Sequence, residues 1–171
     1  GLMFFTDKIE KFIPPKKGKK HILLLIREML EFKPESNGTD INMALEYLTG
    51  ILKKRCATFI VSDFIDTHDY YKSMSIASRK HDLTAIQVYD KREAQLPDVG
   101  LMKLLDAESG EMKWIDTSSK KVRQAYNKWW YERQLNMNVT MQRCKVDVAS
   151  VATDEDYVKS LMGLFKKRGA K

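Results

Sequence analysis

The stretch "CATFIVSDFI", residues 56–65, decides the fold of this chain. It is a nearly continuous run of β-branched and aromatic residues, which is typical of a strand covered on both faces inside a parallel sheet. "LTAIQVYD", residues 83–90, has the same character, and residues 69–80 between the two runs are consistent with a helix. Strand, helix and strand in this order predict a right-handed crossover and an α/β fold.

The segments before this unit predict a hairpin and two helices. "GLMFF" and "KIEKFI" flank the polar pair Thr6-Asp7, and the charged second strand is expected to be an edge. "KKHILLLIREMLEF" carries apolar residues at helical spacing and predicts a core helix. A second helix, whose apolar positions repeat at i, i+3, i+4 and i+7, is predicted directly after "SNGTD".

The segments after the unit complete a single domain. "LMKLLDAESGEMKWID" reads as two short strands around Ser109-Gly110. Residues 119–135 are predicted to be helical, "CKVDVASV" to be a last strand and residues 153–169 to be a last helix. We therefore predict one domain over residues 1–171, with an inserted hairpin at 100–116 and a helix, strand and helix over 118–171.

Composition limits the classes of partner and the cellular compartment that the sequence predicts. The net charge is +7, but Lys and Arg are spread along the chain among 23 acidic residues, so the sequence predicts no nucleic-acid partner. Cys56 and Cys144 lie far apart without metal-binding spacing, which favours small core residues in a reduced, cytoplasmic compartment. No apolar run reaches the roughly 18 residues of a membrane span, so no membrane association of this segment is predicted.

Two polar residues lie near the predicted carboxyl end of a buried strand, where open α/β sheets bind their ligands. Asp63 follows the first buried strand, and Thr39 opens the helix expected to lead back into that strand. A hydroxyl and a carboxylate are hard oxygen ligands of the kind that hold Mg²⁺. "SNGTD" is equally good N-cap chemistry, and an Asp after a strand is often a turn residue. Spacing alone favours the cap and turn interpretation.

Several longer stretches point to a family. "FFTDKIEKFIPP", "GTDINMALEYL", "FIVSDFID" and "VYDKREAQLPDVG" closely resemble a bacterial family of unknown function with a von Willebrand factor A-like domain, often encoded near MoxR-type AAA+ ATPases. The resemblance covers nearly the whole chain. It implies a Rossmann-like, three-layer sheet with helices on both faces. It also implies a metal-ion-dependent adhesion site, in which Thr39 and Asp63 match the family's Thr and Asp.

One part of the family pattern is missing. The Asp-x-Ser-x-Ser motif occurs nowhere in the chain, and in the family it follows a strand that would precede Gly1. The chain therefore reads as N-terminally truncated, with Mg²⁺ or Mn²⁺ expected in the complete protein and no ion bound by this piece. The absent strand would lie between "GLMFF" and "CATFIVSD". We expect Leu2 to Phe5 to pair directly with Phe59 to Asp63, or a homodimer to form by strand pairing or swapping.

Three functions are open from the sequence. The resemblance implies a non-enzymatic interaction module that binds a partner through the metal site, as an adaptor for an AAA+ ATPase. The alternatives are a metal-dependent phosphatase, with Asp63 as nucleophile and Asp66 nearby, and nucleic-acid binding through Trp129-Trp130. The aromatic run "YNKWWYERQ", residues 126–134, is interpreted as core plus an amphipathic surface. The three histidines, His21, His68 and His81, are interpreted as surface or cap residues.

Overall fold

A parallel sheet of three strands forms the centre of the fold. The computed structural model describes residues 1–105 and 112–169. The sheet has the order β3 (Ala57–Ser62), β4 (Asp82–Tyr89) and β7 (Asp147–Ala152), and both pairings are parallel. Helix α3 (Tyr71–Lys80) connects β3 to β4, which confirms the predicted strand, helix and strand. The α/β class follows from this unit.

Helices cover both faces of this sheet. The main core joins α2 (Ile41–Ile51), α3 and α4 (Lys120–Arg143) to β3 and β4, and includes Leu83 and Ala85. The intervening Thr84 points to the opposite face because side chains alternate along a strand. There its hydroxyl contacts Arg168 of α5 (Tyr157–Gly169). The sheet is thus a layer between helices, as expected for a Rossmann-like arrangement.

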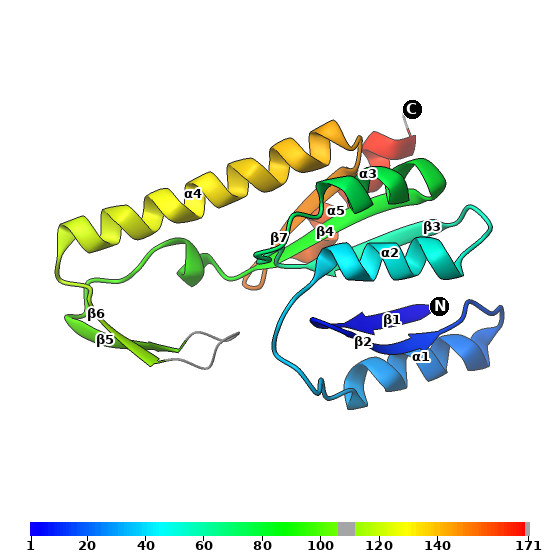
Figure 1. Ribbon diagram of the computed structural model, residues 1–171, viewed down its shortest axis with the longest axis horizontal. Helices are drawn as coiled ribbons and strands as arrows, with labels where there is room; N and C mark the ends of the chain where they lie inside the picture. Colours follow the sequence, from blue (N-terminus) through cyan, green and yellow to red (C-terminus); the bar gives the residue numbers. More distant parts are fainter. Residues whose placement is uncertain (106–111, 170–171) are drawn as a thin grey trace.

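The N-terminal hairpin is a separate small sheet. Strands β1 (Leu2–Phe5) and β2 (Ile9–Ile13) pair antiparallel, as predicted. Helix α1 (Lys19–Glu31) lies beside this hairpin, on the side away from the parallel sheet (Figure 1). None of its residues is buried, and Leu30 is 82% exposed. The prediction of a core helix is wrong because this helix does not reach the main core.

Strand β3 is an edge, which corrects two predictions. Within the described residues it pairs only with β4, and β1 pairs only with β2, so the expected direct pairing of Leu2–Phe5 with β3 is not formed. Phe59 and Val61 are 44% and 56% exposed, so β3 is not covered on both faces. The central strand β4 is the most buried of the three. A strand exchange between two copies stays a prediction.

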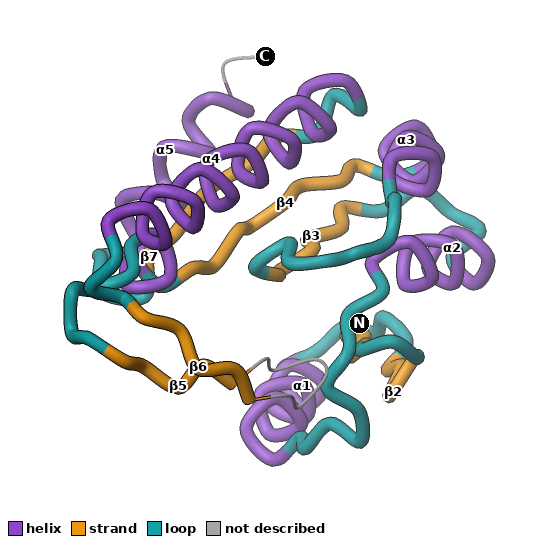
Figure 2. Tube along the Cα trace, turned by 60° about the vertical axis from the view of Figure 1, so that its left-hand side comes forward, coloured by secondary structure: helices purple, strands orange, loops and turns teal. Residues whose placement is uncertain are grey.

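The remaining elements form an extension of the molecule. A short 3-10 helix, η1 (Lys91–Ala94), precedes the predicted hairpin of β5 (Leu101–Leu105) and β6 (Met112–Asp116). The expected turn at Ser109-Gly110 lies outside the described residues. The hairpin lies under the N-terminal end of α4, apart from the parallel sheet (Figure 2). This end of α4 extends past the core.

Helix α4 is longer than predicted, with 24 residues, and its buried residues lie in its C-terminal half. Its buried residues are Met137 and Met141. Trp129 and Tyr131 are 46% and 67% exposed, so these two rings belong to the surface part of the run that was predicted to be core plus an amphipathic surface. The run lies on the part of α4 that extends beyond the parallel sheet (Figure 1).

Two predictions from composition, on the cysteines and on membrane spans, can be compared with the structure. Both thiols are free, with Cys144 buried and Cys56 partly buried, which fits the predicted packing role of Cys144 best. Among the helices of the described residues, none combines the length and the apolar character that crossing a bilayer requires.

Candidate functional site

Polar side chains gather where β3 ends and α2 begins. Asp40 is the N-cap of α2, and its Oδ1 accepts a hydrogen bond from the backbone N–H of Met43 at 2.8 Å. Asp66, in the loop after β3, accepts from the backbone N–H of Ile41 through Oδ2 at 2.7 Å. A helix N-terminus favours negative charge, so both carboxylates stabilise the start of α2. The N-cap interpretation of this junction is therefore confirmed for Asp40.

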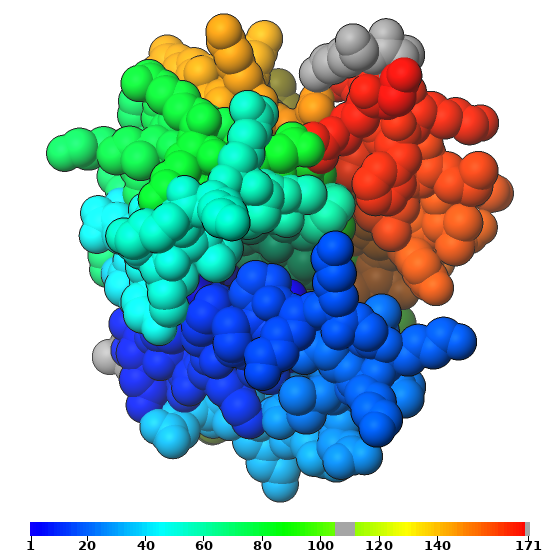
Figure 3. All heavy atoms as spheres, turned by 90° about the vertical axis from the view of Figure 1, so that its right-hand side faces the viewer, coloured from blue at the N-terminus to red at the C-terminus, as the bar shows by residue number. Residues whose placement is uncertain are grey.

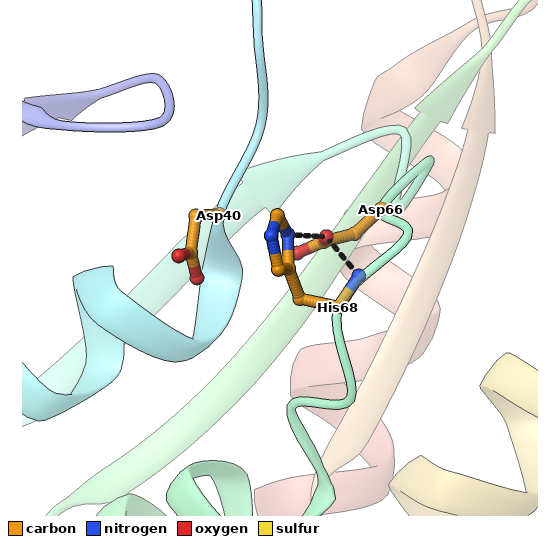
Figure 4. Close-up of side chains that lie close together, drawn as sticks. All are labelled: Asp40, Asp66 and His68. Carbon is orange, nitrogen blue, oxygen red and sulfur yellow. Dashed lines mark hydrogen bonds and ion pairs between the residues drawn. The ribbon is translucent and has the colours of Figure 1, made fainter.

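His68 adds an imidazole to the two carboxylates. Oδ1 of Asp66 accepts from the backbone N–H of His68 at 2.7 Å and lies 2.8 Å from its ring Nδ1. In Figure 4 the His68 ring lies between Asp40 and Asp66, and one ligand atom from each residue lies within 4.8 Å of the others. The Asp66 side chain is fully buried, whereas that of His68 is 54% exposed. We call these three residues the acid–histidine cluster.

A strained turn places Asp66 and His68. Phe64 has a positive φ of 58°, a left-handed conformation that costs a non-glycine residue on the order of 1–3 kcal/mol. Its side chain is only 3% exposed, and its backbone N–H donates to Ser62 Oγ at 3.0 Å. Arg133 on α4 donates to the Phe64 carbonyl at 3.1 Å. Burial of the ring and the contact with α4 thus hold the turn that returns the chain toward α2.

The carboxylates favour the protonated form of His68. The hydrogen bond with Asp66 and the charge of that carboxylate raise the pKa of His68 most, and the charge of Asp40 and a backbone hydrogen bond with Thr39 raise it further. Exposure to solvent keeps the opposing desolvation small. The imidazolium of His68 therefore neutralises part of the carboxylate charge at the start of α2.

This raised pKa predicts a pH-dependent contribution to stability. Protonated His68 stabilises the folded state below its unfolded pKa of about 6.5, and the contribution is lost as the pH rises through the raised folded pKa. The difference in unfolding free energy between the wild type and His68→Gln should therefore shrink with rising pH, as measured by urea titration. Burial lowers the pKa of His81, which acts with the opposite sign but is present in both proteins. A pH-independent difference would exclude the ion pair.

A recess of about 470 Å³ opens beside the acid–histidine cluster. Asp66 and His68 form one side of it, and Trp129 and Arg133 of α4 form another. The Arg133 guanidinium lies 5.3 Å from the centre of the Trp129 ring. Burial raises the pKa of Tyr70, which also lines the recess, to about 12, so its phenol stays neutral. The recess is large enough for a side chain of a partner or a small molecule.

The two site residues named from the sequence lie in this region but outside the cluster. Thr39 directly precedes Asp40 and contacts His68 through its backbone. Asp63 is exposed, and its Oδ1 accepts from the backbone N–H of Ile65 at 2.8 Å, which is a turn contact. Among the described residues, Asp63 is not grouped with Asp40, Asp66 and His68. Its metal-binding role stays a prediction.

His68 was not predicted from the sequence to be a site residue. Asp40 was predicted only as part of the helix cap, and Asp66 only as a second carboxylate for a phosphatase. The signal was the spacing "DTH" at residues 66–68, in which a carboxylate and an imidazole follow the same strand end two residues apart. That spacing indicates a cluster only when Asp40 is known to lie beside Asp66 and His68 in space.

Three mycobacterial proteins that are named as uncharacterized are similar to this chain. It is 25% identical over 162 residues to Rv1480 of Mycobacterium tuberculosis and Mb1516 of Mycobacterium bovis, covering 92% of this chain and 51% of each relative. The chain thus spans about half the length of these relatives. It is 24% identical over 158 residues to MAV169 of Mycobacterium avium, covering 91% of this chain and 93% of that protein.

The chain also resembles one solved structure in its fold and matches one protein family. The crystal structure of the conserved hypothetical protein BatB from Bacteroides thetaiotaomicron superposes with a TM-score of 0.52 at 13% identity, covering 99% of this chain and 78% of that one. At this identity the likeness concerns the fold alone. The family described as protein of unknown function DUF58 matches residues 1–136. Because this match includes well over half of the sequence, the chain belongs to the DUF58 family of proteins of unknown function.

Proposed function

We propose that this chain is a protein-interaction module of the von Willebrand factor A type, which binds an acidic side chain of its partner through a divalent ion. The observation that carries the proposal is the acid–histidine cluster at the carboxyl end of β3, beside an open recess. The von Willebrand assignment and a MoxR-type AAA+ ATPase as partner rest on the sequence resemblance described above.

The chemistry of the cluster fits Mn²⁺ better than Mg²⁺. Two carboxylates are suitable for either ion, but an imidazole ligand favours a transition metal. Asp40 Oδ1 and Asp66 Oδ2 already bond to backbone N–H groups of α2, so an ion would use the remaining ligand capacity of the cluster. His68 would have to lose its proton, and affinity should therefore rise with pH. From Thr39 and Asp63 alone we expected no binding by this chain; three grouped side chains support weak Mn²⁺ binding.

Replacing Asp40 by serine tests the ion site without removing the helix cap. Serine caps helices about as well as aspartate, so Asp40→Ser should fold normally while losing one carboxylate ligand. Calorimetric titration with Mn²⁺ should show an affinity at least about tenfold weaker than that of the wild type, a difference of about 1.4 kcal/mol. Asp69→Ser is the matched control, because Asp69 is an exposed acid in the same loop outside the cluster.

One further variant, Asp63→Ala, decides between ion positions. If Asp63→Ala abolishes Mn²⁺ binding while Asp40→Ser leaves it unchanged, the ion belongs to Thr39 and Asp63, and the cluster serves only as a helix cap. If neither variant changes the affinity, the proposed site is wrong. Binding of a purified MoxR-type ATPase that persists in a chelator would refute the metal-bridged mode of interaction.

We also propose that the chain is not a phosphatase. The exposed carboxylate of Asp63 bonds to its own loop, and the sequence lacks a glycine-rich phosphate loop. Incubation with p-nitrophenyl phosphate and Mn²⁺ or Mg²⁺ should therefore release no nitrophenolate above the rate without protein. Turnover that disappears in Asp63→Asn, but persists in Asp69→Asn, would replace the interaction module by the phosphatase hypothesis.

A further inference from the structure

The recess beside the acid–histidine cluster has a second wall, which consists of side chains of α4. The residues of this wall are Trp129, Glu132, Arg133, Asn136, Met137 and Thr140. The recess measures about 470 Å³, within the roughly 300–1,000 Å³ of pockets that enclose whole small ligands. A single carboxylate bound to an ion therefore fills only part of the recess, and the α4 wall is open to a second group of the same ligand.

Trp129 is the aromatic surface of this wall, and its side chain is 46% exposed. The Arg133 guanidinium lies 5.3 Å from the centre of the indole ring, and the ring centre of Tyr126 lies 5.4 Å from it. These two residues lie one helical turn after and one turn before Trp129. Because its neighbours already hold the indole in place, a ligand can stack on it with little further loss of side-chain freedom.

Arg133 links the aromatic surface to the acid–histidine cluster. Its guanidinium lies beside Trp129 and donates to the Phe64 carbonyl at 3.1 Å. Phe64 forms the turn that places Asp66 and His68. The two walls of the recess are thus joined through one side chain, and a ligand in the recess meets the cluster and the α4 wall together.

The charges of the α4 wall favour an aromatic ring as the second group of the ligand. Aromatic rings are attracted to both indole and guanidinium groups, whereas Arg133 repels the side chain of a lysine or an arginine. The two acids of the recess outside the cluster already have partners. Glu132 lies 3.7 Å from Lys128, and Asp69 accepts from the backbone N–H of Tyr71 at 2.9 Å. A neutral, flat ring therefore matches this wall better than a cationic side chain.

A second cavity among the described residues lacks this combination of groups. It is a groove of about 600 Å³ between the N-terminal hairpin and β3. Figure 3 views the side of the molecule on which the N-terminal segment, in blue, meets α2. No charged side chain lines the groove, so it offers no opposite charge to a carboxylate. Of the two cavities, the recess is the one that suits a ligand with both an acid and a ring.

We propose that the partner segment carries an aromatic residue two positions from the acidic residue that binds the ion, and that its ring stacks on Trp129 beside Arg133. This specificity rests on the ion-bridged interaction proposed above. Side chains two positions apart point to the same side of an extended segment, so the acid and the ring can enter the recess together. The ion holds the acid, and Trp129 selects the segments that bring a ring with it.

Three short peptides test this specificity on the whole chain. They are Asp-Gly-Phe, Asp-Gly-Gly and Asp-Gly-Lys, each acetylated and amidated, and calorimetry measures their affinity for the protein in excess Mn²⁺. The Phe peptide should bind at least about fivefold more tightly than the Gly peptide, because it adds one stacked ring. The Lys peptide should bind no more tightly than the Gly peptide, because Arg133 repels its charge.

Trp129→Ala provides the matching change in the protein. In this variant the affinities of the Phe and Gly peptides should lie within about twofold of each other. Both peptides are compared on the same variant, so a changed ion affinity alters both alike and leaves their ratio intact. Tyr131→Ala is the control, since Tyr131 lies two residues further along α4, is 67% exposed and does not line the recess. This control should keep the wild-type preference.

The outcomes separate this specificity from the ion site itself. If the wild type binds Mn²⁺ but binds the Phe and Gly peptides equally, the ion site stands and the aromatic contact is wrong. A preference for Phe that persists in Trp129→Ala would also refute the contact, as would tightest binding of the Lys peptide. If calorimetry detects no Mn²⁺ binding by the wild type, both the proposed function and this specificity are wrong.

Discussion

Asp66→Ala should lower the free energy of unfolding by about 2–6 kcal/mol, because it leaves two backbone N–H groups without their acceptor at about 1–3 kcal/mol each. One N–H belongs to Ile41, which is 0% exposed at the start of α2, and the other belongs to His68. The Asp66 side chain is itself fully buried, so water does not readily replace its oxygens. The variant should also lose most Mn²⁺ binding.

Urea unfolding, monitored by circular dichroism, measures the first effect of this variant. Asp69→Ala is the control: among the described residues its carboxylate accepts only from the backbone N–H of Tyr71, and both residues are exposed. We expect this control to change stability by less than about 1 kcal/mol. An NMR titration should show the pKa of His68 falling back toward its ordinary value in Asp66→Ala. Wild-type stability together with an unchanged His68 pKa would refute the contacts on which the site is built.

Met74→Ala should destabilise the protein by about 2–5 kcal/mol, the range for truncating a large aliphatic side chain in a packed core. Met74 lies on α3 and is 0% exposed. It belongs to the core that joins α2, α3 and α4 to the parallel sheet. Alanine would leave a cavity at this junction, and the strands beneath α3 cannot move to fill it without losing their pairing.

Ile76→Ala is the matched control for this core variant. Ile76 lies two residues further along the same helix but is 48% exposed, so its removal should cost less than about 1 kcal/mol. Thermal and urea denaturation of both variants measure the difference directly. Similar losses of stability in the two variants would mean that α3 does not present the face that the structure assigns to the core.

The local elements and the α/β class were determined by the sequence itself. Periodicity located the N-terminal hairpin, the helix after "SNGTD" and the two strands around α3, because backbone preferences and apolar spacing act over neighbouring residues. The same local chemistry identified the helix cap, where Asp40 accepts from Met43 three residues on. Thr39 and Asp63 were predicted as site residues by a different general rule, that ligands bind at the carboxyl ends of parallel strands.

Only the tertiary structure decided which surfaces stay open and which side chains meet. An apolar run such as β3 looks the same in sequence whether one or both of its edges are paired, since pairing depends on segments far along the chain. The apolar face of α1 likewise predicts burial, and its exposure follows from its position beside the hairpin. His68 lies in the acid–histidine cluster because Phe64, in a left-handed conformation, turns the loop so that Asp66 and His68 face Asp40. Asp40 and Asp66 are 26 positions apart in the sequence, and no local pattern encodes a contact over that distance.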